Sequence, residues 1–398
     1  MAGRTGIMAP AAVALAIVMM AGGAGAATVD TGAGKLSLSP AIKFIYTYRD
    51  RHEESGVAAL SSAGLRMVEL DAAGGMEAKV GWLVELVAAN GIYRDPITGM
   101  GAAAPSGGPN EFGTIGVRRA EIELRVVPRT VIVAGTFIPA WSPLQERATT
   151  DWGLVDLPLI LTRPEWRALG WQNTGIALAV NPLDQLELGL FYVNGYMPGG
   201  LAGNEAPLPL GGTDREKGMG GRVKVMLGPV RIFGALYGEG WQEDLRGSPR
   251  IERYHLEAWV AGAELVTPKV QALFEWTDLM IPDYQLKLTG KWANLRSLGG
   301  HVDLSWWMLD DWQALFRWEW IDPNTADDKH TFVRSRFDQL VQYTVGVNYR
   351  VTEGATVMVN FVVPIEEGHK VDMDSGKVGG KYQAVENNYF RVQVQVRQ

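Results

Sequence analysis

The sequence predicts an all-β fold, a 16-stranded antiparallel transmembrane β-barrel. Apolar and polar residues alternate with a period of two in almost every segment after residue 26. The connections between these segments alternate between tight turns and long loops. After residue 27 no segment has the roughly 20 consecutive apolar residues of a membrane-spanning helix, so a membrane form of this chain must cross as strands.

Composition excludes several classes of function. The chain has 398 residues, a formal net charge of −7, 47% hydrophobic residues and no Cys. The apolar fraction is too high for a disordered chain, and the absence of Cys removes disulfides, thiolate metal sites and cysteine nucleophiles. An acidic balance also argues against a nucleic-acid-binding surface, so no nucleic-acid partner is expected.

Motifs for catalysis or metal binding are missing as well. The five His stand in no close pairing, and no Ser is flanked as in GxSxG. Asp372 and Asp374 precede Gly376 and could bind calcium, but the remaining ligands of an EF-hand loop are missing, which favours a solvated turn. The sequence predicts no enzymatic activity, no metal site and no cofactor.

Residues 1–26 have the order of a secretory signal peptide. Arg4 is followed by an apolar run over residues 7–20 and then by small residues, with Ala24 and Ala26 placed for cleavage. An uncleaved anchor is the alternative, but the run is shorter than the roughly 20 residues that a spanning helix needs. We therefore assign residues 27–398 to the barrel, located in the bacterial outer membrane after cleavage of the signal peptide.

The alternation recurs along the chain and is seen in its first predicted strand. Ile42, Phe44 and Tyr46 fall on one face of a predicted strand, and Lys43 and Thr47 fall on the other. The sixteen predicted strands lie near residues 36–49, 63–71, 76–88, 115–126, 130–137, 173–181, 185–194, 217–227, 230–239, 253–266, 269–279, 295–309, 312–321, 338–350, 355–363 and 384–397.

The connections distinguish a barrel from a soluble sandwich. Seven joints are tight, at residues 71–75, 127–129, 181–184, 228–229, 267–269, 310–311 and 352–354. The joints between them are long, which is the pattern of an up-and-down barrel with short periplasmic turns and long extracellular loops. An even strand number lets such a sheet close, so that no unpaired edge meets hydrocarbon.

Aromatic residues gather toward the strand ends on the same parity as the aliphatic residues. They suit an interfacial girdle, because their rings tolerate both apolar and polar neighbours. The alternative is that these rings form an ordinary core. The residues concerned are Tyr46, Tyr48, Trp276, Trp306, Trp318, Trp320 and Tyr349.

Several segments resemble the phosphate-selective porin O and P family of outer-membrane channels. The similar segments are residues 118–124 (RRAEIEL), 188–195 (LGLFYVNG), 343–349 (YTVGVNY), 357–361 (VMVNF) and 390–395 (FRVQVQ). The resemblance implies a porin-like, sixteen-stranded homotrimer with an inward-folded third loop. Two features differ from the family: the chain ends Val396-Arg397-Gln398 without a terminal aromatic, and its third long connection contains no Lys. Phosphate selectivity is therefore not carried over.

The third long connection, residues 138–172, is the candidate constriction. It contains Trp141, Trp152, Trp166 and Trp171, and a loop of this length is usually functional or disordered. Folded inward, it would narrow the lumen and direct charged groups at the water path. An extracellular cap is the alternative. The predicted pore-lining arginines of this connection are Arg147, Arg163 and Arg167.

Charged residues also fall on the lumen parity of the strands, twelve basic against nine acidic. A field focused in a narrow tube acts on ions more strongly than the net charge of the whole protein, so a weak anion preference is expected. The alternative is that these charges pair across strands and leave no net field. The predicted lining residues are Arg119, Glu121, Glu123, Arg125, Arg222, Lys224, Arg317 and Glu319.

Together these features predict an outer-membrane porin that lets small anions or other small hydrophilic solutes diffuse passively. The alternative is a plugged barrel that serves as a structural anchor or assembly partner in the outer membrane. The expected partners are the lipid bilayer, outer-leaflet lipopolysaccharide and two further copies of the chain.

Overall fold

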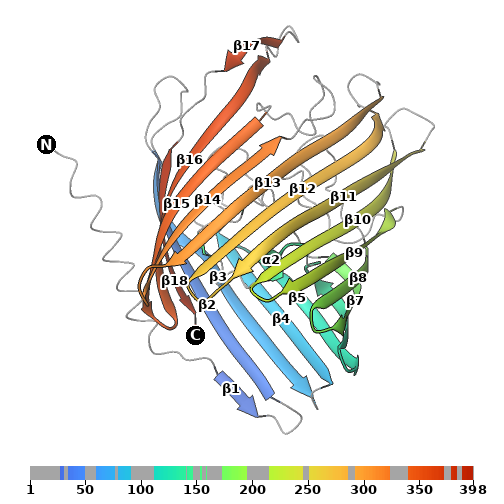
Figure 1. Ribbon diagram of the computed structural model, residues 1–398, viewed down its shortest axis with the longest axis vertical. Coiled ribbons are helices and arrows are strands. Elements are labelled where there is room, and N and C mark those ends of the chain that lie inside the picture. Colours follow the sequence, from blue (N-terminus) through green and yellow to red (C-terminus); the bar gives the residue numbers. More distant parts are fainter. Residues whose placement is uncertain are drawn as a thin grey trace, which may run out of the picture.

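The protein is a closed antiparallel barrel of sixteen strands, seen in the computed structural model in Figure 1. The structure describes residues 27–30, 35–49, 60–76, 79–90, 112–139, 141–146, 153–154, 158, 173–194, 215–244, 251–285, 292–322, 339–371, 378–382 and 388–397. The strands of the ring are β2 (Lys35–Arg49), β3 (Leu60–Met76), β4 (Val80–Asn90), β5 (Phe112–Val127), β6 (Thr130–Phe137), β7 (Asn173–Leu183), β8 (Leu186–Val193), β9 (Arg215–Leu227), β10 (Val230–Asp244), β11 (Ile251–Val266), β12 (Val270–Gln285), β13 (Trp292–Trp307), β14 (Trp312–Asp322), β15 (Gln339–Thr352), β16 (Ala355–Val371) and β18 (Tyr389–Arg397).

Each strand of the ring pairs with the strands before and after it in the chain, apart from the closing joint. There the last strand pairs with the first, with Ile42 opposite Val396 and Tyr48 opposite Phe390. This joint leaves the sheet without an open edge, as hydrocarbon requires of a strand-built wall. The predicted fold class and number of strands are confirmed.

Tight turns and long connections alternate along the ring, as predicted. The first turn, however, was predicted in the wrong place. Residues 71–75 are strand, with Ser39 opposite Asp71, and β3 continues to Met76. Gly74 faces Trp82 on β4, and a Cβ at Gly74 would overlap the Trp82 ring. The small residues of this segment therefore make room for a ring on the next strand, and Lys79 lies exposed in the turn.

Three short elements lie outside the ring. β1 (Ala27–Asp30) pairs with the start of β2, and β17 (Val378–Tyr382) pairs with the far end of β16, where Gly368 is opposite Tyr382. The one-turn helix α2 (Pro143–Glu146) belongs to the third long connection. The signal-peptide prediction and the Asp372–Asp374 turn lie outside the described residues. Across the described part of the chain, no helix is long and apolar enough to cross a membrane.

The outer face of the barrel is apolar. On β5, Ile122, Leu124 and Val126 are exposed, and Leu190, Leu236 and Val345 are exposed on other strands. Aromatic residues lie on the same face near the tight turns: Trp312 packs on Tyr349 with ring centroids 4.7 Å apart, and Trp306 is also exposed. Farther along the strands, the Trp276 and Trp320 rings meet at 5.2 Å across Gly300.

These aromatic residues lie at two levels of the outer wall instead of forming a core. A girdle of this kind marks the two interfaces of a membrane-spanning barrel.

The inner face carries the polar residues. On β14, Gln313, Arg317 and Glu319 are buried and alternate with Trp318 and Trp320, which face outward. Residues of the third connection cover part of this face, at β8, β10, β12 and β15. The parity predicted for this strand is the parity observed.

Candidate pore constriction

The third long connection contacts the inner wall first through Trp141. This ring is 2% exposed and packs edge-on against Phe191 of β8 and Tyr237 of β10, with ring centroids 4.8 and 5.1 Å away. Gly218 and Gly220 lie between these strands on β9, and a Cβ at either position would overlap Tyr237 or Phe191. The two glycines thus let the Phe191 and Tyr237 rings lie flat over β9. These two rings form the seat for Trp141, that is, the surface on which it packs.

The short helix α2 follows directly. Leu144 N donates to Ser142 Oγ at 3.2 Å, and Pro143 occupies the first helical position, where its missing N–H costs nothing. Ser142 also lies beside the Glu275 carboxylate of β12. The cap therefore fixes α2 against the wall next to the Trp141 seat.

The connection then reaches the opposite part of the wall. Asn348 of β15 donates from Nδ2 to Gly153 O at 2.7 Å and to Gln313 Oε1 at 3.1 Å. Leu154 is buried beside these groups. Residues 141–144 and 153–154 thus touch β8, β10, β12 and β15 from inside the barrel. Whether residues 138–172 as a whole fold inward stays a prediction, because most of them, including Arg147, Arg163 and Arg167, lie outside the described residues.

The four predicted lining residues of β5 share one face of that strand. Arg119, Glu121, Glu123 and Arg125 alternate with the exposed apolar residues of the outer wall. Arg119 donates to Glu121 within the same strand, at 2.5 Å from Nη2 and 3.3 Å from Nε. This pair lies along one strand, whereas the pairs Arg222–Glu187, Arg231–Glu264 and Arg317–Asp303 join neighbouring strands, as the alternative expects.

A second charged group spans β8 and β9. Arg222 and Lys224 both approach Glu187, with Lys224 Nζ 3.9 Å from Glu187 Oε2. Gly189 lies opposite Arg222 and makes room for its side chain. The group holds two cations and one carboxylate.

The remaining predicted residues lie on β14. Arg317 forms a double hydrogen bond with Asp303 of β13, at 2.6 and 2.7 Å. Glu319 is 2% exposed and accepts from Gln342 Nε2 at 2.6 Å. Such charge-assisted bonds hold side chains in fixed orientations, which suits a wall that lines a passage.

The structure brings Arg317 and Glu319 together with Glu275, which was counted on the lumen parity, and with His301, which was not predicted. In register, His301 stands between Glu275 and Glu319 on neighbouring strands, and both His301 and Glu275 are fully buried. Within the described residues no three His, Asp or Glu side chains are arranged to hold a metal ion. His301 falls on the same lumen-facing parity of β13 as Asp303, and this parity was the sequence signal that could have identified His301.

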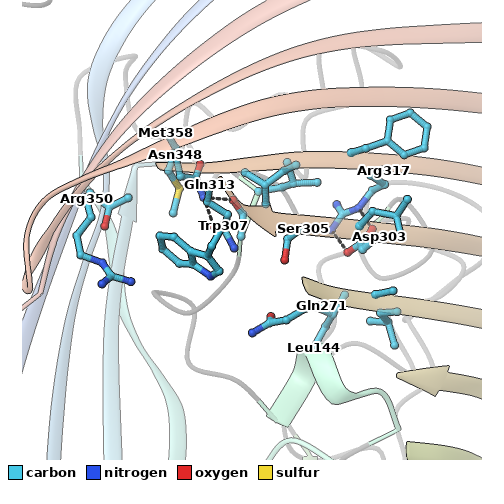
Figure 2. A pocket seen from close by; sticks show the side chains of 18 of the residues that line it. Leu144, Gln271, Asp303, Ser305, Trp307, Gln313, Arg317, Asn348, Arg350 and Met358 are labelled. Carbon is cyan, nitrogen blue, oxygen red and sulfur yellow. Dashed lines mark hydrogen bonds and ion pairs between the residues drawn. The ribbon is translucent and has the colours of Figure 1, made fainter. Parts of the chain in front are cut away.

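A cavity of about 350 Å³ lies inside the barrel between the third connection and the tight-turn rim. Leu144, Gly153 and Leu154 line it from the third connection, and the inner faces of β12 to β16 provide most of the rest. Figure 2 shows Arg350 and Trp307 toward one end of this cavity and the Arg317–Asp303 pair toward the other. Of these cavity residues, Arg317 was a predicted pore-lining residue, and Asp303 and Arg350 were among the charges counted on the lumen parity of the strands.

Three solved structures share the fold over nearly their whole length. DcaP, an outer membrane channel of Acinetobacter baumannii, matches with a TM-score of 0.62 and 10% identity, over 93% of this chain and 99% of that chain. An anion-selective porin from Comamonas acidovorans matches with a TM-score of 0.59 and 11% identity, over 92% and 99%. The trimer form of OmpT, an outer membrane protein of Vibrio cholerae, matches with a TM-score of 0.53 and 9% identity, over 92% and 100%.

At these identities the likeness establishes the fold alone. No protein-family model matches the sequence, and no curated protein is detectably similar to it. The resemblance to the phosphate-selective porin O and P family therefore stays a prediction.

Proposed function

We propose that this protein is an outer-membrane porin through which small hydrophilic solutes diffuse passively. The observation that carries the proposal is a closed barrel with an apolar outer face, an inner face of polar and charged residues, and residues of one long connection packed in its interior. Such a wall meets lipid outside and water inside. The lipid bilayer and, in the outer leaflet, lipopolysaccharide are its proposed surroundings.

The third connection is the proposed size filter. Its described residues contact wall strands on different sides of the lumen, through Trp141 at β8 and β10 and through Gly153 at β15. Residues that contact the wall at both of these places narrow the water path. Arg147, Arg163 and Arg167 are proposed to face that path.

A weak anion preference is the proposed selectivity. The Arg119 and Arg231 side chains are 29% and 41% exposed, whereas their partners Glu121 and Glu264 are 2% and 1% exposed. Cations therefore reach the water farther than the carboxylates that neutralise them. The Arg317–Asp303 pair has the opposite exposure, which keeps the preference weak.

Planar-bilayer recording with the folded mature protein tests these proposals. Stepwise conductance is the result expected of a porin, and a reversal potential in a KCl gradient that favours chloride is expected of the proposed selectivity. Silent bilayers despite confirmed folding would favour the plugged-barrel alternative, and a cation-favouring potential would refute the charge argument. A homotrimer is also proposed, as in the trimer form of OmpT, and sedimentation in detergent measures it directly.

A further inference from the structure

We infer that the cavity below the third connection binds a small polyhydroxylated monocarboxylate, the class of solute that D-gluconate represents. The inference deepens the proposed function and rests on it, because such a solute reaches the cavity through an open lumen. The volume of the cavity, about 350 Å³, falls in the range of small-molecule sites and is far larger than one inorganic ion requires.

Most ionic groups of the cavity wall are already neutralised. Asp303 holds Arg317, and Glu264 accepts from Arg231 at 3.1 Å. Arg350 and Glu353 also line the cavity, and neither has an ion pair within the part of the chain that the structure describes. Arg350 is therefore the cation left to recognise an anionic group.

The geometry of Arg350 suits a carboxylate. Its guanidinium carbon lies 4.5 Å from the centroid of the Trp307 ring, so one face of the group is covered by indole. Stacking on a ring leaves the N–H donors at the edge of the guanidinium, where they can bind both oxygens of one carboxylate. Figure 2 shows these two side chains together at one end of the cavity.

The neighbouring wall offers neutral hydrogen-bonding groups. Gln271 of β12 and Ser305 of β13 are directly opposite each other and line the cavity, and no hydrogen bond of either side chain occurs among the described residues. An amide and a hydroxyl both donate and accept, as ligand hydroxyls do. Leu154, Leu315 and Met358 line another part of the wall and suit the C–H surface of a carbon chain.

This combination selects among solutes. A bare carboxylate would use Arg350 and leave Gln271 and Ser305 unoccupied. A neutral sugar would use the amide and the hydroxyl but would leave the guanidinium without an anion. A carboxylate that carries several hydroxyls engages both ends of the cavity.

Titration calorimetry of the folded full-length protein in detergent micelles tests the inference with D-gluconate, propionate and D-glucose. Gluconate is expected to bind at least about tenfold more tightly than either of the other two, because each lacks one set of hydrogen bonds. Arg350→Gln should weaken gluconate binding about tenfold or more, and Arg350→Lys should restore part of the loss, since it keeps the charge without the planar fork.

Arg129→Gln is the matched control. Arg129 is also an exposed arginine at the tight-turn rim, but it pairs with Asp184 at 2.6 Å and does not line the cavity. Its gluconate affinity should equal that of the unsubstituted protein. Equal affinities for gluconate and propionate, or an unchanged affinity in Arg350→Gln, would overturn the inference.

Recording in bilayers separates this inference from the proposed function. Brief gluconate-dependent interruptions of the current are expected, and they should become shorter in Arg350→Gln. Steady conductance without interruptions, together with no calorimetric binding, overturns the inference and leaves the porin proposal intact. Silent bilayers with gluconate binding retained would refute the porin proposal instead.

Discussion

Replacing Trp141 by Ala should release the third connection from the wall while leaving the barrel closed. A buried Trp removes about 150–250 Å² from water, which at about 25 cal/mol per Å² corresponds to roughly 4–6 kcal/mol. The two edge-on ring contacts, with Phe191 and Tyr237, each add about 0.5–1.5 kcal/mol. Since about 1.4 kcal/mol is a tenfold change in an equilibrium constant, losing even 4 kcal/mol shifts the docked-to-released ratio nearly a thousandfold.

The barrel itself does not depend on this contact, because its strands pair around the whole ring without residues of the third connection. Single-channel recording of Trp141→Ala should therefore show a larger or flickering conductance, while far-ultraviolet circular dichroism keeps the β-sheet signal. Trp312→Ala is the matched control, since it removes the same side chain from the outer face, where Trp312 packs on Tyr349. Conductance that is unchanged in Trp141→Ala and equal to the control would refute the proposed role of the third connection.

Further substitutions test the charged residues of the inner wall and the glycines of β9 beneath the seat for Trp141. Glu187→Gln removes the carboxylate that Arg222 and Lys224 share, so the chloride-to-potassium permeability ratio from reversal potentials should rise a few-fold, as for ion pairs worth about 1 kcal/mol or less; a fall in this ratio would contradict the charge argument. Gly220→Ala should lower the free energy of unfolding by about 1–3 kcal/mol, because its Cβ would overlap Phe191 and the Leu236 carbonyl. Gly234→Ala is the control, because a Cβ there makes only ordinary contacts, and it should change this free energy by about 0.5 kcal/mol or less in the same denaturation assay. Equal losses in the two variants would show that the overlap with Phe191 is not the cause.

The strands were predictable because one face of each meets an apolar surrounding and the other meets water. Alternation therefore has to persist along β14, where Gln313, Arg317 and Glu319 face in and Trp318 and Trp320 face out. The first turn was misplaced for a related reason. Adjacent Ala and Gly residues are typical of turns, but in β3 the same small residues make room for Trp82 on the neighbouring strand.

The contacts of the third connection were harder to predict, because they join residues far apart in the sequence. Trp141 could be recognised as one of four Trp in a long connection, but its seat consists of side chains from β8 and β10 and two glycines of β9. The register of β8, β9 and β10 brings these residues together, and Trp141 reaches them from a different part of the chain. The burial of His301 between Glu275 and Glu319 likewise follows from strand register, which the spacing of histidines along the chain does not contain.

Counting charges by parity also treats all lining residues as equal, and the structure gives a physical reason why they are not. Lys79 falls within the predicted strand 76–88 but lies exposed in a turn. Glu121 and Glu264 are buried against the wall, whereas Arg119 and Arg231 extend farther into solvent on longer side chains. In the proposed channel, the arginines that bind such carboxylates lie between them and a passing ion. The sign of the field in the water path of the proposed channel therefore depends on which member of each ion pair lies nearer to the water. Neither the net charge of −7 nor the count of lining residues determines this arrangement.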